Sequence, residues 1–572
     1  MNRNVESHFA LNPTNIDIRR STFDRSHSLK TSFNVGDIVP FFIDEVLPGD
    51  TFNVDTSKVV RLQTLLTPVM DNIYLDTYYF FVPNRLTWSH WKQFNGENTQ
   101  SAWIPQTEYE IPQITAPASG GWSVGTIADY LGVPTGVPNL SVSALPFRAY
   151  ALIMNEWFRD ENLSDPLVVP VDDATVAGVN TGTFVTDVAK GGLPYKAAKY
   201  HDYFTSCLPS PQKGPDVLIP VAEAGNYPVV GNGKGLALVG SSGPFSLVTN
   251  IVNGGMRGWN LGSPAGSEGS FNDLKNFGSP SPVLGVPTQA QLGNDLSNSG
   301  LVAVASGNAA AATINQLRMA FQIQKLYEKD ARGGSRYIEI LKSHFGVTSP
   351  DARLQRPEYL GGNRIPININ QVVQQSATAS GETAQGTVTG MSVTTDTHSD
   401  FTKSFTEHGF VIGVMVARYD HTYQQGLERF WSRKDRFDYY WPVFANIGEQ
   451  AVKNKEIYAQ GPAKKDSAGN VIDDQVFGYQ EAWADYRYKP SRVTGEMRSQ
   501  YAQSLDVWHL ADDYSALPML SDSWIREDKT NVDRVLAVTS SVSNQLFADI
   551  YIKNRTTRPM PMYSIPGLID HH

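Results

Sequence analysis

Two segments in the C-terminal half of the chain place aromatic rings among arginine and lysine residues. Residues 428–443 read ERFWSRKDRFDYYWPV, and residues 477–498 read FGYQEAWADYRYKPSRVTGEMR. Single-stranded nucleic acid requires such a surface, because rings stack on its bases and cations neutralise its phosphates. We favour the competing interpretation, in which the rings pack inward, because acidic residues cancel much of the charge. The rings of the first segment are Phe430, Trp431, Phe437 and Tyr440, and its acidic residues are Glu428, Asp435 and Asp438.

Basic residues also stand near both ends of the chain. Residues 1–35 are polar, and Asp17 and Asp24 dilute their positive charge. This dilution favours a solvated arm over an arm that touches phosphate or a neighbouring subunit. The C-terminal tail is locally basic as well. The candidate DNA-facing residues are Arg19, Arg20, Arg25, Lys30, Arg555 and Arg558.

Two short motifs match patterns of enzymes but lack the surroundings that those patterns need. Residues 121–125 match the nucleophile motif G-x-S-x-G, which requires a buried strand before it and a helix after it. The preceding residues read TAPASG, so we predict a loop. The run GNGKG at 231–235 lacks the spacing of a phosphate-binding loop and the Ser or Thr after its lysine, so we predict a turn. No catalytic residue is predicted.

The side chains that bind metals are scattered. Cys207 is the one cysteine, so neither an intrachain disulfide nor a cysteine-based zinc site can form. Single histidines such as His90, His201 and His344 lack companions at ligand spacing. We therefore predict no metal and no cofactor. The abundant Asp and Glu leave a paired-carboxylate glycosidase site open, although no pattern marks one.

The charge and hydropathy of the whole chain limit its partners. The 572 residues carry a net charge of −10 at pH 7, with a sequence pI of about 5.6. Any contact with nucleic acid must therefore be local or supplied by a partner, because proteins that bind it through their own charge are basic. The N-terminus lacks the apolar core of a signal peptide, and the longest apolar run, residues 410–417, is too short to cross a bilayer. We expect a soluble protein from a reducing compartment, without membrane insertion.

The strongest strand prediction is residues 73–82, IYLDTYYFFV. Both faces of this strand are apolar or aromatic except at Asp76, so we expect it to be covered on both sides, and Pro83 ends it. Residues 408–419, HGFVIGVMVARY, form a second apolar strand and a candidate partner of the first in a sandwich core. Further strands are expected within 36–52, 58–66, 359–373, 505–510 and 535–553.

Helices and loops interrupt the strand pattern. Apolar residues recur at helical spacing in residues 145–158 and 309–345, the second run being broken by a pair of glycines. Residues 104–140 and 376–400 are rich in turn-forming residues, and we interpret them as loops. Residues 209–307 hold many Gly, Ser, Asn and Pro and few charges. We expect a surface insertion that orders mainly against copies of itself, because charged residues are depleted at the cores of interfaces.

Several long stretches are similar in sequence to one family of proteins. They read VMDNIYLDTYYFFVPNRLTW at 69–88, WKQFNGEN at 91–98, FNVGDIVPFFIDEVLPGDTF at 33–52, LPFRAYALIMNEWFRDENL at 145–163, LRMAFQIQKLYEKDARGGSRYIEILKSHFGV at 317–347, EHGFVIGVMVARYDHTYQQGLERFW at 407–431, and WHLADDY at 508–514. The chain resembles the major capsid proteins of the Microviridae, the small single-stranded DNA phages, and in particular their gokushovirus branch. The resemblance spans nearly the whole chain in order.

The resemblance implies an all-β fold. The family has an eight-stranded antiparallel jelly roll, a viral capsid β-sandwich, with long loop insertions that contain helices. On this basis we divide the chain into an N-terminal arm (1–35), a first part of the jelly roll with loop and helix insertions (36–208), a surface insertion (209–307), and helices with the remainder of the jelly roll (308–572).

The function implied by the resemblance is that of a structural shell protein. Copies of it would self-assemble into a T=1 icosahedral virion around a circular single-stranded DNA genome, in the cytoplasm of the host bacterium. The implied partners are a small basic internal DNA-binding protein, scaffolding and pilot proteins, and a host surface receptor. The basic protein would reconcile the acidic pI with a DNA-filled particle.

In gokushoviruses one large insertion forms a protrusion at the threefold axes, and residues 209–307 are our candidate for it. The candidate host-contact residues within it are Asn232, Lys234, Arg257 and Trp259. Two other classes of protein remain open. A phage tail or receptor-binding β-protein predicts a small oligomer, and a β-sandwich carbohydrate-active enzyme requires a carboxylate pair in a cleft and a secretion signal.

Overall fold

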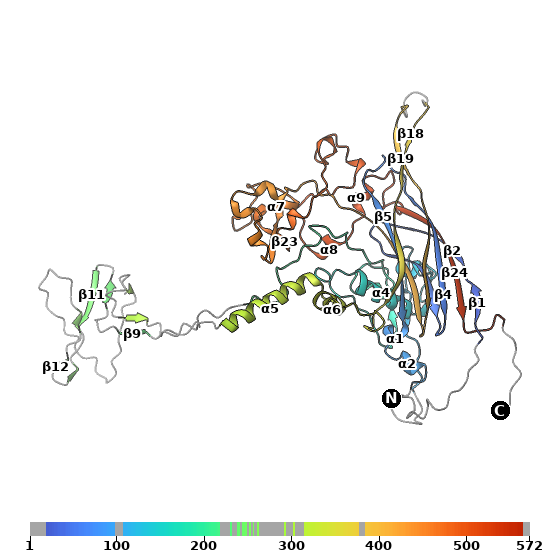
Figure 1. Cartoon of the computed structure of the whole chain (residues 1–572), viewed down its shortest axis with the longest axis horizontal. Helices are drawn as coiled ribbons and strands as arrows, with labels where there is room; N and C mark the ends of the chain where they lie inside the picture. The colour runs from blue at the N-terminus through green and yellow to red at the C-terminus, as the bar shows by residue number, and fades with distance from the viewer. Residues whose placement is uncertain are drawn as a thin grey trace. The chain divides into compact units, whose positions relative to one another are not determined.

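A computed structural model describes residues 19–97, 107–217, 314–376 and 384–563, together with the backbone of short strands between 229 and 303. The chain falls into two compact units. The first consists of Met1–Gly214 and Tyr327–His572, and the second of Pro215–Leu326. The first unit holds two large antiparallel sheets (Figure 1).

The first large sheet contains β1 (Ser21–Asp24), β2 (His27–Phe33), β4 (Thr51–Leu62), β20 (Thr394–Ser404) and β24 (Leu546–Arg558). Its order is β1-β24-β4-β20, and β2 also pairs with β24. β24 pairs with β4 from Leu546 opposite Leu62 to Thr557 opposite Thr51. The two strands at the N-terminus are thus joined to the last strand of the chain (Figure 1).

The second large sheet contains β3 (Val39–Val46), β5 (Ile73–Pro83), β17 (Glu358–Pro366) and β21 (Gly409–Tyr419). Its order is β17-β5-β21-β3. β5 and β21 pair along their whole length, from Pro83 opposite Gly409 to Ile73 opposite Tyr419. The sequence predicted both strands and their pairing, and the structure confirms them.

The inner faces of the two sheets share one hydrophobic core. Val54 of β4 and Ile550 of β24 pack in the same cluster as Leu75 of β5 and Met415 of β21. Burying such a side chain stabilises the fold by roughly 1.5–3 kcal/mol. The two large sheets therefore form a β-sandwich, which bears out the all-β prediction in its general form.

A second core covers the outer face of the β17-β5-β21-β3 sheet. Helix α4 (Leu145–Ile153) continues as a π-helical turn, Met154–Phe158, and together they pack on that face. The ring centroid of Phe80 lies 5.3 Å from that of Trp157 and 6.0 Å from that of Phe158. β5 is therefore buried on both sides, as its sequence predicted, and the predicted helix at 145–158 is present.

A third cluster gathers around Phe204, Tyr423 and Val452 and thus joins the segment near Phe204 to the C-terminal loops. Beside it, His421 is buried between two carboxylates, with Nδ1 3.0 Å from Asp512 and Nε2 3.1 Å from Glu527. Burial would lower the pKa of His421, but the charges of Asp512 and Glu527 outweigh it and raise that pKa to about 10. The imidazole is therefore charged at neutral pH.

The remaining elements of the first unit are short. Its helices are α1 (Asn84–Thr87), α2 (Trp91–Phe94), α3 (Ile127–Tyr130), α6 (Tyr337–Phe345), α7 (Asn454–Ile457), α8 (Asp522–Ile525) and α9 (Thr530–Asp533). Its small strands are β6 (Gln113–Thr115), β7 (Ser141–Ser143), β8 (Val176–Ala177), β18 (Ile369–Val373), β19 (Val388–Ser392), β22 (Glu449–Lys453) and β23 (Val476–Glu481). Short 3-10 turns follow at Val188–Lys190, Arg429–Ser432, Arg436–Asp438, Pro442–Phe444, Ile472–Asp474, Ala484–Tyr486, Gly495–Met497 and Asp506–Trp508.

Helix α5 (Ile314–Gly333) begins in the second unit and ends in the first. Gly334 follows it with φ +93°, a left-handed conformation that glycine adopts readily, and a Cβ there would meet the carboxyl of Glu339. The chain turns at this point into α6, which ends at Phe345 and is capped by Gly346. The predicted break between two helices at the paired glycines is thus confirmed.

The second unit contributes short strands. They are β9 (Val229–Gly231), β10 (Ala237–Gly240), β11 (Gly243–Val248), β12 (Ile251–Val252), β13 (Gly255–Met256), β14 (Asn260–Leu261), β15 (Gln291–Leu292) and β16 (Leu301–Ala303). Four of them form a small sheet in the order β14-β11-β10-β15. Most of the insertion predicted at 209–307 lies outside the described residues.

Three predictions about local structure are wrong. The loop expected at 376–400 contains β19 and the start of β20 in its described part, because pairing with β18 and β4 supplies the hydrogen bonds of these Ser- and Thr-rich strands. The irregular arm expected at 1–35 contains β1 and β2 from residue 21 onward, since both strands form hydrogen bonds with β24. The strand expected at 505–510 is a turn around Asp506–Trp508.

Candidate nucleic-acid and assembly surfaces

Three of the six candidate DNA-facing residues bond to β3 or to the turn after it. Arg20, Arg25 and Arg558 fasten the two ends of the chain to β3 and to the turn that follows it. Arg25 pairs with the buried carboxylate of Asp44, and Arg558 Nε donates to Asp50 at 3.1 Å. The other partners are the main-chain oxygens of Gly49 for Arg20 and of Glu45 for Arg558. These contacts give each of the three arginines a structural role within the fold.

Arg20 is nevertheless exposed, as are the other three candidates, Arg19, Lys30 and Arg555. Lys30 Nζ lies 3.7 Å from the carboxylate of Asp549 across the β2–β24 pair, and both side chains are solvated. Lys553 Nζ of β24 lies 3.5 Å from the carboxylate of Asp55 on β4. The outer face of the β1-β24-β4-β20 sheet therefore mixes both signs of charge, and it is not a continuous basic patch.

The aromatic residues of 428–443 do not pack inward. Trp431 is 68% exposed and Phe437 is 58% exposed, and Phe430, Tyr439, Tyr440 and Trp441 are each at least 40% exposed. The interpretation that we favoured from the sequence is therefore wrong for these rings. The physical reason is local: three separate 3-10 turns build this segment, so it has no regular face that could place alternate side chains inside.

The two aromatic and basic segments face each other across one cavity of about 570 Å³, which we call the aromatic-basic cavity. Sequence reasoning named both segments, but their meeting could not be read from spacing, since residues 444–476 separate them. Rings and cations from each segment line it. The lining includes the rings of Phe430, Trp431 and Tyr488 and the charged side chains of Glu428, Lys489 and Arg492.

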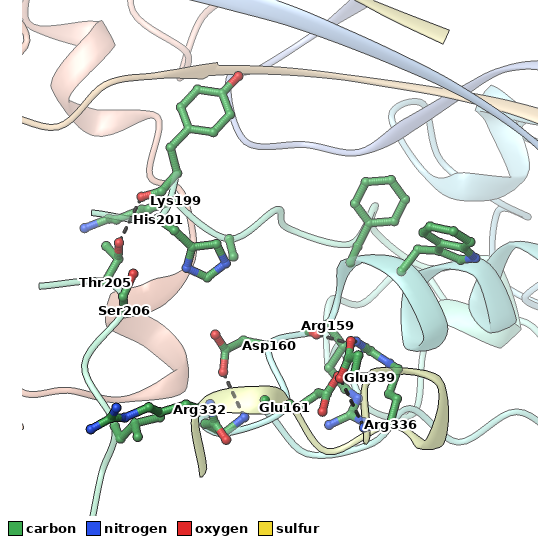
Figure 2. Close-up of a pocket in the computed structure, with 18 of the residues that line it drawn as sticks. Arg159, Asp160, Glu161, Lys199, His201, Thr205, Ser206, Arg332, Arg336 and Glu339 are labelled. Carbon is green, nitrogen blue, oxygen red and sulfur yellow. Dashed lines mark hydrogen bonds and ion pairs between the residues drawn. The ribbon is translucent and has the colours of Figure 1, made fainter. Parts of the chain in front are cut away.

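A larger cavity of about 1190 Å³ lies beside α6 and the second large sheet. Figure 2 shows Glu161, Arg336 and Glu339 gathered on one wall, and His201, Thr205 and Ser206 on another. Arg336 pairs with Glu161 and lies 3.2 Å from Glu339. Burial raises the pKa of Glu339, and its hydrogen bond with Glu161 raises it further.

These two carboxyl groups are committed to the start of α6. Glu339 accepts the main-chain N–H of Arg336 at 3.1 Å, and Glu161 accepts that of Ser335. Groups that satisfy the free N–H donors of a helix in this way stabilise its first turn. The contacts of this carboxyl pair are therefore those of a helix cap at the bend between α5 and α6.

The same cavity borders a buried ion cluster on β5. Asp76, 1% exposed, accepts from Arg364 Nε at 2.6 Å and from Arg418 Nη2 at 2.5 Å, and the hydroxyl of Tyr200 donates to it at 3.0 Å. Burial would raise the pKa of Asp76, but the hydrogen bonds and charges of the two arginines hold it below its usual range. The one charged residue of the predicted strand is thus a buried, ionised carboxylate.

No cluster of three or more His, Cys, Asp or Glu side chains suited to a metal ion occurs within the described residues. Within the same part of the chain, no helix has the length and apolar character needed to cross a membrane. Cys207 is buried, and burial raises the pKa of its thiol. The candidate host-contact residues Asn232, Lys234, Arg257 and Trp259 lie outside the described residues.

Comparison with known proteins places this all-β chain in a structural class. The family model described as "Capsid protein (F protein)" matches residues 13–568, and the chain belongs to this phage capsid protein family. The chain is 44% identical over 591 residues to "Capsid protein VP1" of Chlamydia phage 1, a match that covers 99% of this chain and 98% of that protein.

Two further relatives support the same assignment. The "Capsid protein VP1" of Bdellovibrio phage phiMH2K is 42% identical and is matched over 98% of its length, with 99% of this chain covered. That of Spiroplasma virus 4 is 42% identical, with 96% of both chains covered. The resemblance to Microviridae capsid proteins that the sequence stretches indicated is confirmed, and the relatives are structural proteins.

Proposed function

We propose that this chain is the major capsid protein of a phage and that copies of it assemble into a T=1 icosahedral shell around a circular single-stranded DNA genome. The observation that carries the proposal is the match to capsid proteins over nearly the whole chain. The relatives are matched almost end to end, so no large part of this chain is left to serve a different activity.

We further propose that the sandwich is an eight-stranded jelly roll. In that fold, eight consecutive strands divide between two four-stranded sheets, with long connections between the sheets. The two strand orders, β2-β24-β4-β20 and β17-β5-β21-β3, support this topology, because consecutive strands alternate between sheets except where the long connections intervene. The insertions between the strands carry the helices and the second unit.

The proposed place of the protein is the virion, after assembly in the cytoplasm of the host bacterium. The net charge of −10 supports a division of labour, because an acidic shell needs a separate basic protein to neutralise most of a packaged genome. A small basic internal protein, scaffolding and pilot proteins, and a host receptor are therefore the proposed partners. Arg19, Lys30 and Arg555 remain the better candidates among the six for contact with DNA, because they are exposed and are not among the three arginines that bond to β3 and the turn after it.

Sedimentation velocity of the purified protein tests this proposal, with negative-stain images of any fast fraction. Closed isometric particles are the expected result. A monomer or trimer that stays small even when co-expressed with the scaffolding protein would instead favour the tail or receptor-binding alternative. Particles isolated from cells should protect circular single-stranded DNA from nuclease, and empty particles under all conditions would contradict the genome-enclosing part.

We propose that the second unit, Pro215–Leu326, is the surface protrusion that meets the host. Its separation as a compact unit supports this role, as does the closeness of its two ends, since the N–H of Lys213 donates to the carbonyl of Tyr327 at 3.2 Å. A variant that replaces Pro215–Leu326 by a short Gly-Ser linker should fold and lose host attachment. An unfolded product would show that this unit is part of the core.

A further inference from the structure

We propose that the aromatic-basic cavity binds one nucleotide of single-stranded DNA, with the base stacked on Phe430 and Trp431 and the phosphate held by Lys489 and Arg492. The proposal rests on the proposed function for the presence of such DNA. The cavity of about 570 Å³ is concave, so a base must leave its own stack to enter it. A single strand meets that condition at little cost, and a duplex must first unpair.

The two rings on this wall are partly exposed to solvent. Trp431 is 68% exposed and Phe430 is 40% exposed, and their centroids lie 4.7 Å apart. Large rings at a protein surface are normally covered by a partner when they gather in a patch. Tyr488 differs, because it stacks on Tyr203 at 5.2 Å with nearly parallel rings. Tyr488 is therefore a fixed wall, and the other two rings are the platform.

The cations of this cavity exceed the carboxylates that face them. Lys489 Nζ lies 2.6 Å from Glu428, and Arg492 pairs with the same carboxylate. Burial would raise the pKa of Glu428, but these two cations hold it below its usual range, so Glu428 carries one negative charge against two positive ones. Both cations are more than half exposed. One positive charge is left over at the mouth of the cavity, which suits a phosphate.

The cation that would hold the phosphate and a ring that would stack on the base lie next to each other in this cavity. Lys489 Nζ lies 5.2 Å from the centroid of Phe430, so the charge for a phosphate and the platform for a base are neighbours. That spacing matches one nucleotide, whose base and phosphate are joined through a single sugar. Because the whole chain is acidic, the surplus positive charge is a local property of this site.

Binding of a fluorescein-labelled oligodeoxythymidylate to the full-length, unassembled protein tests the proposal by anisotropy. Trp431→Ala should weaken binding by about 5- to 100-fold, the usual loss when one stacking ring is removed. Trp441→Ala is the matched control, because Trp441 is a half-exposed tryptophan of the same segment that does not line the cavity. An unchanged affinity in Trp431→Ala, or an equal loss in both variants, would overturn the proposal.

The salt dependence separates a phosphate contact from a structural role. Arg492→Gln should reduce the slope of log affinity against log salt concentration by about 0.7, the value for one phosphate of a single strand. A merely structural arginine would leave that slope unchanged, and this result would count against the site. Unlabelled duplex of matched length should compete less well than the single strand, and equal competition would contradict base stacking in the cavity.

Particle assembly distinguishes a failure of the nucleotide-site proposal from a failure of the proposed shell function. If Trp431→Ala forms closed particles that protect DNA and binds the oligonucleotide as well as the unaltered protein does, the nucleotide site is wrong and the shell function stands. If Trp431→Ala keeps its thermal stability and oligonucleotide affinity but no longer assembles, the rings are a contact between copies of this chain, and the nucleotide site is again wrong. If the unaltered protein never forms particles, the shell function fails whatever the oligonucleotide does.

Discussion

The two large sheets share one core, but their outer faces have opposite surroundings. On β24, every second residue is exposed, and the open face carries Tyr551, Lys553 and Arg555. On β5, both faces are buried, because α4 and the turn after it cover the outer side. The covered sheet therefore holds the molecule together, while the open face is available to groups outside the chain.

The largest expected effect comes from placing a charge on the covered face. Phe80→Asp should abolish folding, because Phe80 is 1% exposed and an unpaired buried charge costs several kcal/mol. Tyr551→Asp is the matched control on the open face, where a charge stays in water and should change the free energy of unfolding by less than about 0.5 kcal/mol. Soluble expression and circular dichroism measure both. A folded Phe80→Asp protein would show that the outer side of β5 is not sealed.

Removing the buried carboxylate of the covered sheet should cost nearly as much. Asp76→Ala leaves Arg364 and Arg418 without their shared partner, and breaking a buried ion pair in this way costs about 3–5 kcal/mol. Chemical denaturation gives the value. Since the pKa of Asp76 is lowered by folding, its contribution is complete above its unfolded pKa of about 3.9 and is lost as pH falls further.

Asp76→Asn separates the charge from the packing. The stability difference between this variant and the unaltered protein should therefore be constant near neutral pH and shrink below about pH 4. Asp549→Asn on the open face provides the comparison, because its partner Lys30 is solvated and the difference should be small at every pH. A difference for Asp76→Asn that does not depend on pH would mean that the carboxylate is not ionised in the folded protein.

His421, a cation just beyond the covered sheet, should contribute to stability with a pH dependence opposite to that of Asp76. His421 follows β21, and folding raises its pKa to about 10 from an ordinary value near 6.5. Its contribution is therefore complete below about pH 6.5 and is lost as pH rises through 10. His421→Gln should cost about 2–3 kcal/mol at neutral pH, because hydrogen bonds to charged groups are lost. The melting temperatures of the two proteins should converge toward pH 10, and a gap that widens would contradict the charged imidazole.

Much of this contrast between the sheets was already visible in the sequence. The apolar run of β5 predicted a strand covered on both sides, and a strand was expected within 535–553, where apolar and other residues alternate. The partner of β5 was also predicted, since β21 has the same doubly apolar character. Asp76 could be singled out as the exception on its strand, but its arginine partners come from β17 and β21, far away in the sequence.

The predictions failed where local pattern and tertiary contact disagree. β19 and β20 are built largely from Ser, Thr and Asp, which resemble a loop until pairing with β18 and β4 supplies their hydrogen bonds. The rings at 430–441 were expected inside because neighbouring acidic residues cancel much of the local charge, but each of them is at least 40% exposed among the residues that the structure describes. The aromatic-basic cavity depends on the meeting of two distant segments, and no local signal encodes such a meeting.

The smallest expected effect concerns the charge pairs of the open face. The double variant Lys30→Gln with Asp549→Asn should change the free energy of unfolding by less than about 1 kcal/mol, because solvated ion pairs contribute little. Denaturation in low and high salt measures it, and the small difference that exists should shrink as salt screens the pair. If this face is covered in the shell, the same variant should alter particle yield far more than monomer stability. A variant that destabilises the monomer by several kcal/mol would instead mean that the face called open is covered within a single chain, and the contrast between the two sheets would no longer hold.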